Sequence, residues 1–303
     1  MQGLIMRIVW NMVKQALVGY AVVFSIAGTL LLVIAGWVVL TPVLRVKHLK
    51  THNPAQTLYM KGQRNWLRSK GLPDTLSHRF VPLDSISPHL VKAVLAAEDD
   101  GFYAHPGFDI RAIARAVEHN QNNAGRRRRG ASTITQQMAK NLFTGGKRSF
   151  ERKYRELAYA VLMEHFLGKK RILELYLNYA QWGKNIFGCE AAARHYYQRS
   201  ASSITMGQAA HLAAVLARPN HLTPHYTESG LLQKRMRVIS NNLYRRRSID
   251  TTTWRELGGQ DSLLELRATL EALQFEGAQS RESADTVPTG ETDSAGTTHR
   301  VEF

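Results

Sequence analysis

The strongest candidate for acid–base chemistry is Glu98, which ends the apolar segment PHLVKAVLAAE and is followed directly by Asp99 and Asp100. Three consecutive acids at the C-terminal end of a helix oppose the helix macrodipole, which disfavours negative charge there. Sequences usually keep such a local conflict where it has a use. A carboxylate in a partly dry cleft has a raised pKa, as general acid–base catalysis requires. The same residues are equally compatible with an acidic surface turn, so both interpretations stay open at this point.

A second group with chemical potential is Arg152, Lys153 and Glu156. Glu156 follows Arg152 by four residues and Lys153 by three, so all three lie near one face of a helix. Two cations beside a carboxylate could hold a pyrophosphate leaving group and stabilise its developing charge. As surface ion pairs they would contribute only about a few tenths of a kcal/mol each. The spacing taken alone favours surface ion pairs.

Hydroxyl and amide side chains gather in the segment GASTITQQ, residues 130–137. They supply donors and acceptors suited to the oxygens of a sugar or a phosphate. The alternative is a helix N-terminus capped by Ser132 or Thr133, because the following MAKNLF continues in a helical pattern.

Positive charge dominates the composition and is concentrated in one region. The 303 residues carry a formal net charge of +16, and residues 126–171 hold 13 Lys or Arg against three Glu. Such a surplus points to an anionic partner: nucleic acid, a membrane surface or a phosphorylated substrate. The arginines at 126–129 are either a solvated face or a basic loop that touches anionic lipid.

Several classes of site are excluded by what the sequence lacks. A single cysteine, Cys189, rules out an intramolecular disulfide framework and a multi-cysteine zinc site. HExxH, Walker-type GxxxxGK and SxxK motifs are absent, which removes support for a zinc hydrolase, a P-loop enzyme and an SxxK acyl-enzyme. The basic region has no interleaved aromatic stacking platform, so we expect no nucleic-acid partner.

An apolar run near the N-terminus predicts one transmembrane helix. Residues 15–44 contain no charged side chain, and Tyr20 and Trp37 stand where interfacial anchors would lie. A signal peptide would have a shorter apolar region and a small-residue cleavage site after it, and LTPVLRVKHLK offers none. A buried core helix is the other alternative. Cations flank both ends of the run, so the positive-inside rule does not decide the orientation.

The elements that must position these residues are mostly helices. Helical spacing of apolar residues marks 88–98, the long segment from Ser149, the segment 169–180, and SITMGQAAHLAAVLA, whereas strand-like alternation is scarce. The fold class is therefore predicted as mainly α. The expected organisation is a cytoplasmic N-terminus with a transmembrane helix (1–44), a stalk (45–80), the main domain (81–245), a helical extension (246–276) and a disordered tail (277–303).

Four ordered motifs together resemble the peptidoglycan glycosyltransferases of glycosyltransferase family 51. They are EDDGFYAHPG (98–107), GASTITQQ (130–137), RKYRE (152–156) and KKRILELYLN (169–178), and FGCEAAARHYYQRSASSIT further resembles the monofunctional biosynthetic branch, which lacks a transpeptidase domain. The resemblance covers roughly 81–243. It implies a lysozyme-like glycosyltransferase domain with one N-terminal transmembrane helix, on the extracytoplasmic, periplasmic side of the bacterial cytoplasmic (inner) membrane.

The resemblance also implies a reaction and residue roles. The family polymerises lipid II into β-1,4 glycan strands with inversion and releases undecaprenyl pyrophosphate. Glu98 matches the general base on the acceptor C4 hydroxyl, and Glu156 the second carboxylate near the donor pyrophosphate, assisting departure directly, through water or through a divalent cation (Mg or Mn). The remaining matches bind substrate, with no protein metal ligand assigned: Lys140, Arg152 and Lys153 to phosphates, and Ser132, Gln136 and Gln137 to sugar and pyrophosphate.

The sequence departs from the family pattern in two places. The fifth motif, usually a pair of arginines before Val-Leu, appears as KRMRVI at 234–239, and Gln181 stands where the monofunctional branch commonly has Glu. The expected partners are lipid II, the nascent glycan strand and the membrane, with other cell-wall synthesis proteins as candidates. Three alternatives remain: a lytic enzyme of the same fold, a membrane-tethered nucleic-acid-binding protein, and a scaffold that has lost its chemistry.

Overall fold

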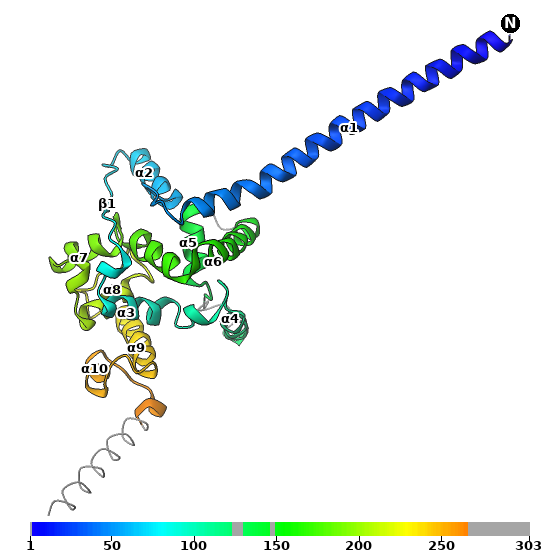
Figure 1. Ribbon diagram of the computed structural model, residues 1–303. Coiled ribbons are helices and arrows are strands. Elements are labelled where there is room, and N and C mark those ends of the chain that lie inside the picture. Colours follow the sequence, from blue (N-terminus) through cyan, green and yellow to red (C-terminus); the bar gives the residue numbers. More distant parts are fainter. Residues whose placement is uncertain (1, 123–129, 146–148, 266–303) are drawn as a thin grey trace, which may run out of the picture.

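The structure, a computed structural model, describes residues 2–122, 130–145 and 149–265 (Figure 1). The helices are α1 (Gln2–His48), α2 (Leu58–Ser69), α3 (Pro88–Glu98), α4 (Ile110–Asn122), α5 (Ile134–Ala139), α6 (Phe150–Tyr179), α7 (Cys189–Tyr197), α8 (Met206–Val215), α9 (Gly230–Arg245) and α10 (Thr251–Glu256). Short helical turns lie at η1 (Leu83–Ser85), η2 (Phe102–Ala104), η3 (Lys140–Thr144) and η4 (Ala201–Ser203). The strands β1 (Ser77–His78), β2 (Gln181–Gly183) and β3 (Ile186–Phe187) form one small sheet in the order β1-β3-β2. The prediction of a mainly α fold with one long apolar N-terminal helix is confirmed.

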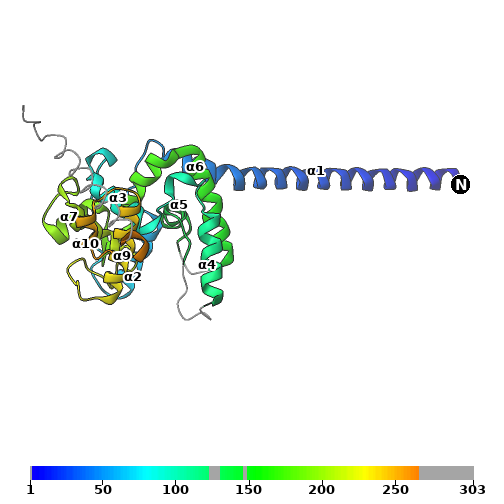
Figure 2. The ribbon, with the colours of Figure 1, turned by 90° about the horizontal axis from the view of Figure 1, so that it is seen from below.

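Helix α1 leaves the rest of the molecule as one long rod (Figures 1 and 2). Its most apolar 18-residue window has a mean hydropathy of 2.5, and none of that window is buried. Large apolar side chains such as Phe24 and Trp37 are 74% and 69% exposed. A buried core helix, the alternative left open by the sequence, is therefore wrong for this segment.

The core forms where α3 packs against α8 and α9, and where α5 packs against α6. Helix α3 begins at Pro88, whose fixed φ suits the first helical position. Its Leu90 and Val94 are fully buried, four residues apart on the face that meets α8 and α9. This packing fixes the direction in which the last residue of α3, Glu98, leaves the core.

Local capping sets the start of the two helices that carry the other candidate residues. Thr133 and Gln136 form a reciprocal capping box at the start of α5. Ser149 caps α6 by accepting a hydrogen bond from the backbone N–H of Arg152. Helix α6 is interrupted at Gly168, whose φ of 73° and ψ of 165° are not helical. Segments 150–167 and 169–179 are therefore two consecutive helices with different directions.

The segment expected to be a stalk packs against the body. Val46, Leu49, Met60 and Leu67 are buried in the main hydrophobic cluster, and Ser77 in β1 pairs with β3. The amphipathic spacing of Met60 and Leu67 on α2 places both on one face, which explains why this polar-looking segment can dock.

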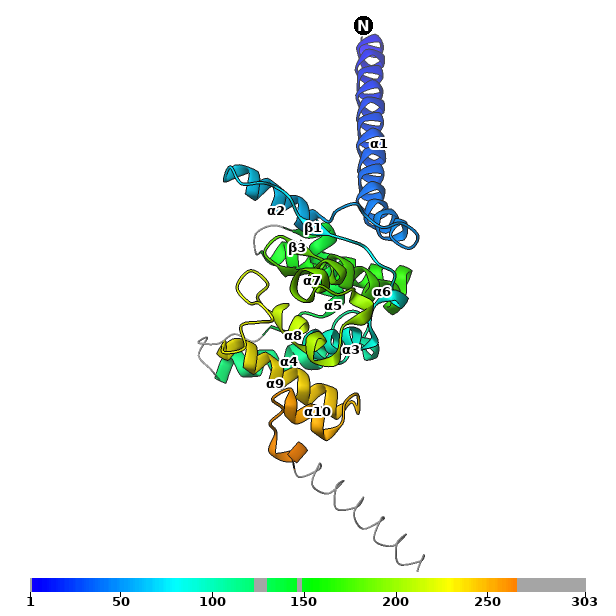
Figure 3. The same ribbon diagram turned by 90° about the vertical axis from the view of Figure 1, so that its left-hand side faces the viewer.

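After α9 the chain forms a small second cluster at the end of the body away from α1 (Figures 1 and 3). The rings of Tyr244 and Trp254 stack with centroids 5.0 Å apart, and Leu264 is buried beside them. Trp254 and Leu264 of this cluster belong to the first part of the expected helical extension. The remainder of that extension, the tail at 277–303 and the basic run at 126–129 lie outside the described residues.

Candidate active site

A cleft of about 1030 Å³ opens beside the C-terminal end of α3. Its walls come from the loop after α3, the start of α4, the segment before α5, and α9. Glu98, Ser132 and Gln137 line it together. The structure thus brings residues from two of the predicted motifs to one space.

Glu98 lies between α5 and α9 with a side chain only 11% exposed. Arg235 Nη2 donates to Oε1 at 2.5 Å, and Gln137 Nε2 donates to Oε2 at 2.8 Å. Burial raises the pKa of Glu98, while the Arg235 guanidinium and the Gln137 amide act in the opposite direction. The result is a carboxylate at the wall of the cleft whose pKa is raised by burial above that of an exposed glutamate.

The Gln137 amide is itself held in one orientation from behind. The Tyr176 hydroxyl, on the buried second half of α6, donates to Gln137 Oε1 at 3.1 Å. Burial raises the pKa of Tyr176 well above its usual value, so this hydroxyl stays a donor. Gln137 must therefore present its NH₂ group to Glu98.

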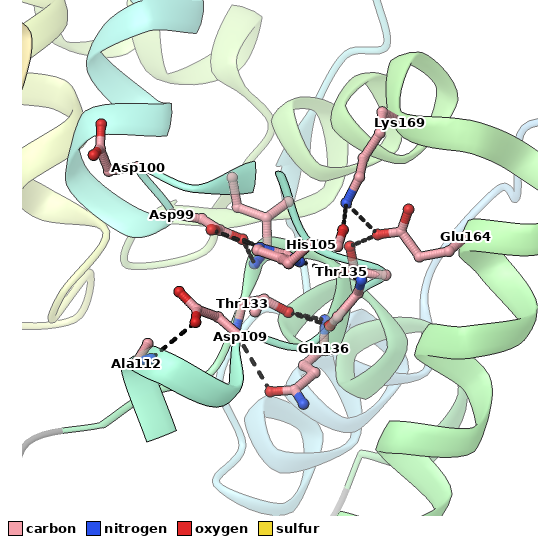
Figure 4. Close-up of polar contacts among 12 residues, drawn as sticks. Asp99, Asp100, His105, Asp109, Ala112, Thr133, Thr135, Gln136, Glu164 and Lys169 are labelled. Carbon is pink, nitrogen blue, oxygen red and sulfur yellow. Dashed lines mark hydrogen bonds and ion pairs between the residues drawn. The ribbon is translucent and has the colours of Figure 1, made fainter. Parts of the chain in front are cut away.

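Asp99 joins the loop after α3 to the start of α5 (Figure 4). Its Oδ1 lies 2.9 Å from His105 Nε2, and its Oδ2 accepts the Ile134 backbone N–H at 3.0 Å. The Gly107 N–H donates to His105 Nδ1, which leaves the ring proton on Nε2, facing Asp99. Burial raises the pKa of Asp99, and the bonds from His105 and Ile134 oppose this. A negative charge at the N-terminus of α5 is also favoured by the helix dipole.

The same loop is tied to α6 by a second, partly buried group (Figure 4). Glu164 Oε1 accepts from Thr135 Oγ1 at 2.6 Å and from Lys169 Nζ at 2.8 Å, and Lys169 also donates to the His105 carbonyl. Gly107 passes close by with a φ of +93°, and a Cβ there would lie 2.8 Å from Glu164 Cγ. Only glycine fits this position.

The second candidate group forms one ion-pair cluster on the first half of α6. Glu156, 4% exposed, lies 3.1 Å from Arg152 Nη1 and 3.4 Å from Lys153 Nζ. Lys153 Nζ reaches out of the cluster to Ser132 Oγ at 3.1 Å and to Gln136 Oε1 at 3.4 Å. Because Ser132 lines the cleft, Lys153 joins the ion-pair cluster to the space occupied by Glu98.

Six of the eight predicted site residues fall into two linked sets, and Gln136 and Lys140 make up the remainder. Glu98, Gln137 and Ser132 line the cleft, whereas Arg152, Lys153 and Glu156 are not among the described residues that line it. Gln136 is buried, with its amide engaged in the α5 capping box. Lys140 lies on η3 with its ammonium 5.9 Å from the Tyr59 ring centroid.

Arg235 is the residue at this site that reasoning from the sequence missed. It belongs to KRMRVI, the altered fifth motif, and it contacts Glu98 from a position 137 residues away. The signal was present in the three acids that close α3, because a buried acidic helix end requires a cation from elsewhere in the fold.

The donor set does not suit a resident divalent cation. Glu156 is a single carboxylate whose two oxygens already face Arg152 and Lys153. The described residues contain no group of three or more His, Cys, Asp or Glu side chains that could hold a metal ion. The Mg or Mn ion that the resemblance suggested would have to take most of its ligands from the pyrophosphate and water.

Comparison with known proteins gives a family match over most of the body. Residues 66–244 match the family model described as Transglycosylase. A biosynthetic peptidoglycan transglycosylase of Bordetella pertussis is 45% identical over 196 residues, which cover 62% of this chain and 81% of the relative. Another, from Azoarcus sp. strain BH72, is 48% identical over 170 residues, which cover 56% and 73%. Penicillin-binding protein 1A of Haemophilus influenzae aligns structurally over 60% of this chain and 18% of its own, with 18% identity and a TM-score of 0.34, too low to bear on fold or function.

Proposed function

The chain belongs to the transglycosylase family, and we propose that it polymerises lipid II into β-1,4 glycan strands with inversion, releasing undecaprenyl pyrophosphate. It is a peptidoglycan transglycosylase; the identity of the substrate, the stereochemistry and the residue roles are the proposal. The observation that carries these roles is the buried Glu98 carboxylate, oriented by Gln137 and Arg235 at the wall of a cleft of about 1030 Å³.

In the proposed reaction Glu98 accepts the proton of the acceptor's C4 hydroxyl as that oxygen attacks the donor's anomeric carbon. The new C–O bond forms while the bond from the anomeric carbon to the pyrophosphate oxygen breaks, and the leaving oxygen takes the electron pair. General-base assistance of this kind typically contributes about 10²–10⁴-fold in rate. The pKa raised by burial supports the assignment, because a base with a pKa nearer the working pH is more effective.

The cluster on α6 is assigned to the departing pyrophosphate. Arg152 and Lys153 together outweigh the charge of Glu156, so the cluster keeps net positive charge for an anionic group. Arg152 Nε is buried without a hydrogen-bond partner among the described residues, and a phosphate oxygen would supply the missing acceptor. Lys140 is assigned to the phosphates as well, and Ser132 with Gln136 to the sugar and pyrophosphate oxygens.

Membrane anchoring through α1 is part of the same proposal. A lipid-linked substrate requires the cleft to work beside a bilayer, and α1 is long enough to cross one. Exposed apolar side chains on α4 and the first half of α6 support contact of this side with lipid: Ile110, Ile113, Val117, Phe150 and Tyr154. We assign the catalytic domain to the extracytoplasmic side of the cytoplasmic membrane, with a single span.

Cysteine labelling tests this topology. The native Cys189 is buried and thus unreactive, so single cysteines can be added at Gln2 and at the exposed Glu228. In intact spheroplasts, a membrane-impermeant maleimide should label Glu228→Cys and leave Gln2→Cys unlabelled. The opposite pattern would reverse the orientation, and labelling of both would contradict a single span.

Polymerisation of lipid II by the detergent-solubilised full chain tests the function. Wild type should give glycan ladders on a resolving gel, and Glu98→Gln should lose at least about 100-fold in rate. Glu228→Gln, which removes an exposed carboxylate outside the cleft, should match wild type. Near-wild-type ladders from Glu98→Gln would refute the general-base role. Shortening of preformed glycan by the wild type would favour the lytic alternative, and bound but unconverted lipid II would favour a scaffold.

A further inference from the structure

Helix α9 presents a polar stripe to the end of α3 that carries Glu98. Arg235, Ile239, Asn242 and Arg246 follow one another at intervals of four, three and four residues, which places them on one helical face. Ile239 is fully buried, in keeping with the packing of α9 against α3. The polar members of the stripe all reach the last turn of α3 or Asp100, two residues beyond it.

Side chains of the stripe donate hydrogen bonds to backbone carbonyls that have no partner within α3. The last four carbonyls of a helix have no partner within the helix. Asn242 Nδ2 donates to the Ala96 carbonyl at 2.8 Å, and Arg235 Nη2 donates to the Ala97 carbonyl at 2.9 Å. Ala96 is only 5% exposed, so without Asn242 its carbonyl would be buried and unpaired, which costs about 1–3 kcal/mol.

Arg246 fixes the chain two residues beyond Glu98. Its Nε donates to Asp100 Oδ1 at 2.9 Å, and its Nη2 donates to Oδ2 at 3.1 Å and to the Asp100 carbonyl at 2.6 Å. The planar guanidinium therefore holds both the side chain and the backbone of one residue. Because the side chains are 57% and 42% exposed, this contact adds little stability, and its main effect is on geometry.

We propose that Asn242 and Arg246 are positioning residues for the general base. They hold the last turn of α3 and Asp100 in register with α9, so that Glu98 stays between Gln137 and Arg235. This inference rests on the proposed role of Glu98. Small displacements of a catalytic group have large kinetic effects, since a shift of about 1 Å can cost up to about 100-fold in rate.

A comparison of neighbouring arginines tests the role of Arg246. Arg246→Gln should lower kcat for lipid II about threefold to tenfold and leave KM within about twofold. Arg245→Gln removes the same charge from an adjacent residue of similar exposure, but Arg245 pairs with Asp261 rather than with the α3 end. It should stay within about twofold of wild type. Arg246→Lys keeps the charge without the planar fork and should recover less than half of the lost kcat. Equal effects of the two Gln variants, or a change in KM alone, would overturn the proposal.

Asn242 provides a second test that changes no charge. Asn242→Leu keeps a similar size but cannot donate to the Ala96 carbonyl, and it should lower kcat at least as much as Arg246→Gln. Pairing Asp100→Asn with Arg246→Gln should cost no more than the larger single effect, because both remove one contact. Fully multiplicative losses would contradict a shared role.

An activity-independent readout separates this proposal from the proposed function. The Asp99 backbone N–H bonds to the Leu95 carbonyl at 2.9 Å and reports on the last turn of α3. Its hydrogen exchange should accelerate at least about threefold in Arg246→Gln and not in Arg245→Gln. If the wild type does not polymerise lipid II, the proposed function is wrong, but the hydrogen exchange of the Asp99 backbone N–H still tests the positioning contact. Normal polymerisation with unchanged exchange in Arg246→Gln would refute the positioning role alone.

Discussion

Replacing Arg235 by Gln should move the acid limb of the polymerisation pH profile to higher pH. Glu98 must be ionised to accept a proton, and burial already raises its pKa. Arg235 is the cation that contacts it, at 2.5 Å and with only 23% of its side chain exposed. Loss of this charge leaves the effect of burial less opposed, so the pKa of Glu98 rises further and less of the base is ionised at neutral pH.

The size of the shift follows from the geometry. A cation within about 4–6 Å lowers the pKa of a carboxyl group by about 1–3 units. The remaining neighbours of Glu98 do not replace the lost cation: Gln137 is neutral, Tyr176 is a protonated phenol, and Asp99 is an acid that raises the pKa of Glu98. We therefore expect an upward shift of about one to two units, equivalent to about 1.4–2.7 kcal/mol. At pH values below the acid limb, the rate should fall about tenfold for each pH unit.

The assay is kcat/KM for lipid II between about pH 5 and pH 9, since this parameter reports the ionisation of the free enzyme. Arg237→Gln removes the same charge from the exposed face of α9 and should leave the limb in place. Arg235→Lys should keep most of the wild-type profile. The activity of Arg235→Gln should return as the pH rises. An unmoved acid limb, or a loss that is equal at every pH, would refute the assignment of the limb to Glu98 and Arg235.

Three further perturbations have defined outcomes. Lys153→Gln should raise KM for lipid II about tenfold, because a charge-assisted contact is lost, whereas Lys170→Gln, 74% exposed, should not; equal KM values would remove Lys153 from phosphate binding. Glu156→Gln should reduce kcat about 100-fold with the fold intact by circular dichroism, because the carboxylate assigned to assist departure of the pyrophosphate is lost, and a rate near wild type would remove Glu156 from the chemistry. Gly107→Ala should lower the unfolding free energy by about 1–3 kcal/mol, since its φ is +93° and its Cβ would meet Glu164; an unchanged denaturation midpoint would contradict this steric argument.

Local patterns were enough to predict several of the helices and the order of the motifs. The spacing of Leu90 and Val94 predicted α3, and the hydroxyls before MAKNLF predicted a capped helix, with Thr133 as the residue that forms the capping box. The uncharged run at 15–44 predicted an apolar helix that the core does not bury. These features depend on neighbours in the sequence, which is why a single sequence contains them.

The periodicity of the sequence could not predict contacts between distant segments. Nothing within KRMRVI indicates that Arg235 meets Glu98, because their pairing depends on how α9 crosses α3. The glutamine at position 181, where the monofunctional branch commonly has Glu, is also explained by contacts with residues distant in the sequence. Its amide donates to Asn220 Oδ1 at 2.8 Å and accepts from the Tyr59 hydroxyl at 3.1 Å, and a carboxylate could not make the first bond. The spacing within RKYRE favoured surface ion pairs, but Glu156 is 4% exposed because the α6 face that carries it packs inward.

The break in α6 at Gly168 divides one apparent helix into two units of unequal stability. The second unit, 169–179, is anchored by Leu173, Leu175 and Tyr176, and the later part of the first unit by Ala160 and Met163, whereas the first unit begins with exposed residues such as Phe150 and Tyr154. With non-helical φ and ψ at 168, the backbone hydrogen bonds of the first unit do not depend on those of the second. The first turns of the first unit, with Arg152 and Lys153, can thus open at a free energy below that of global unfolding. A substrate that binds these residues would close that gap, so occupancy of the cluster should stabilise this unit more than the rest of the molecule.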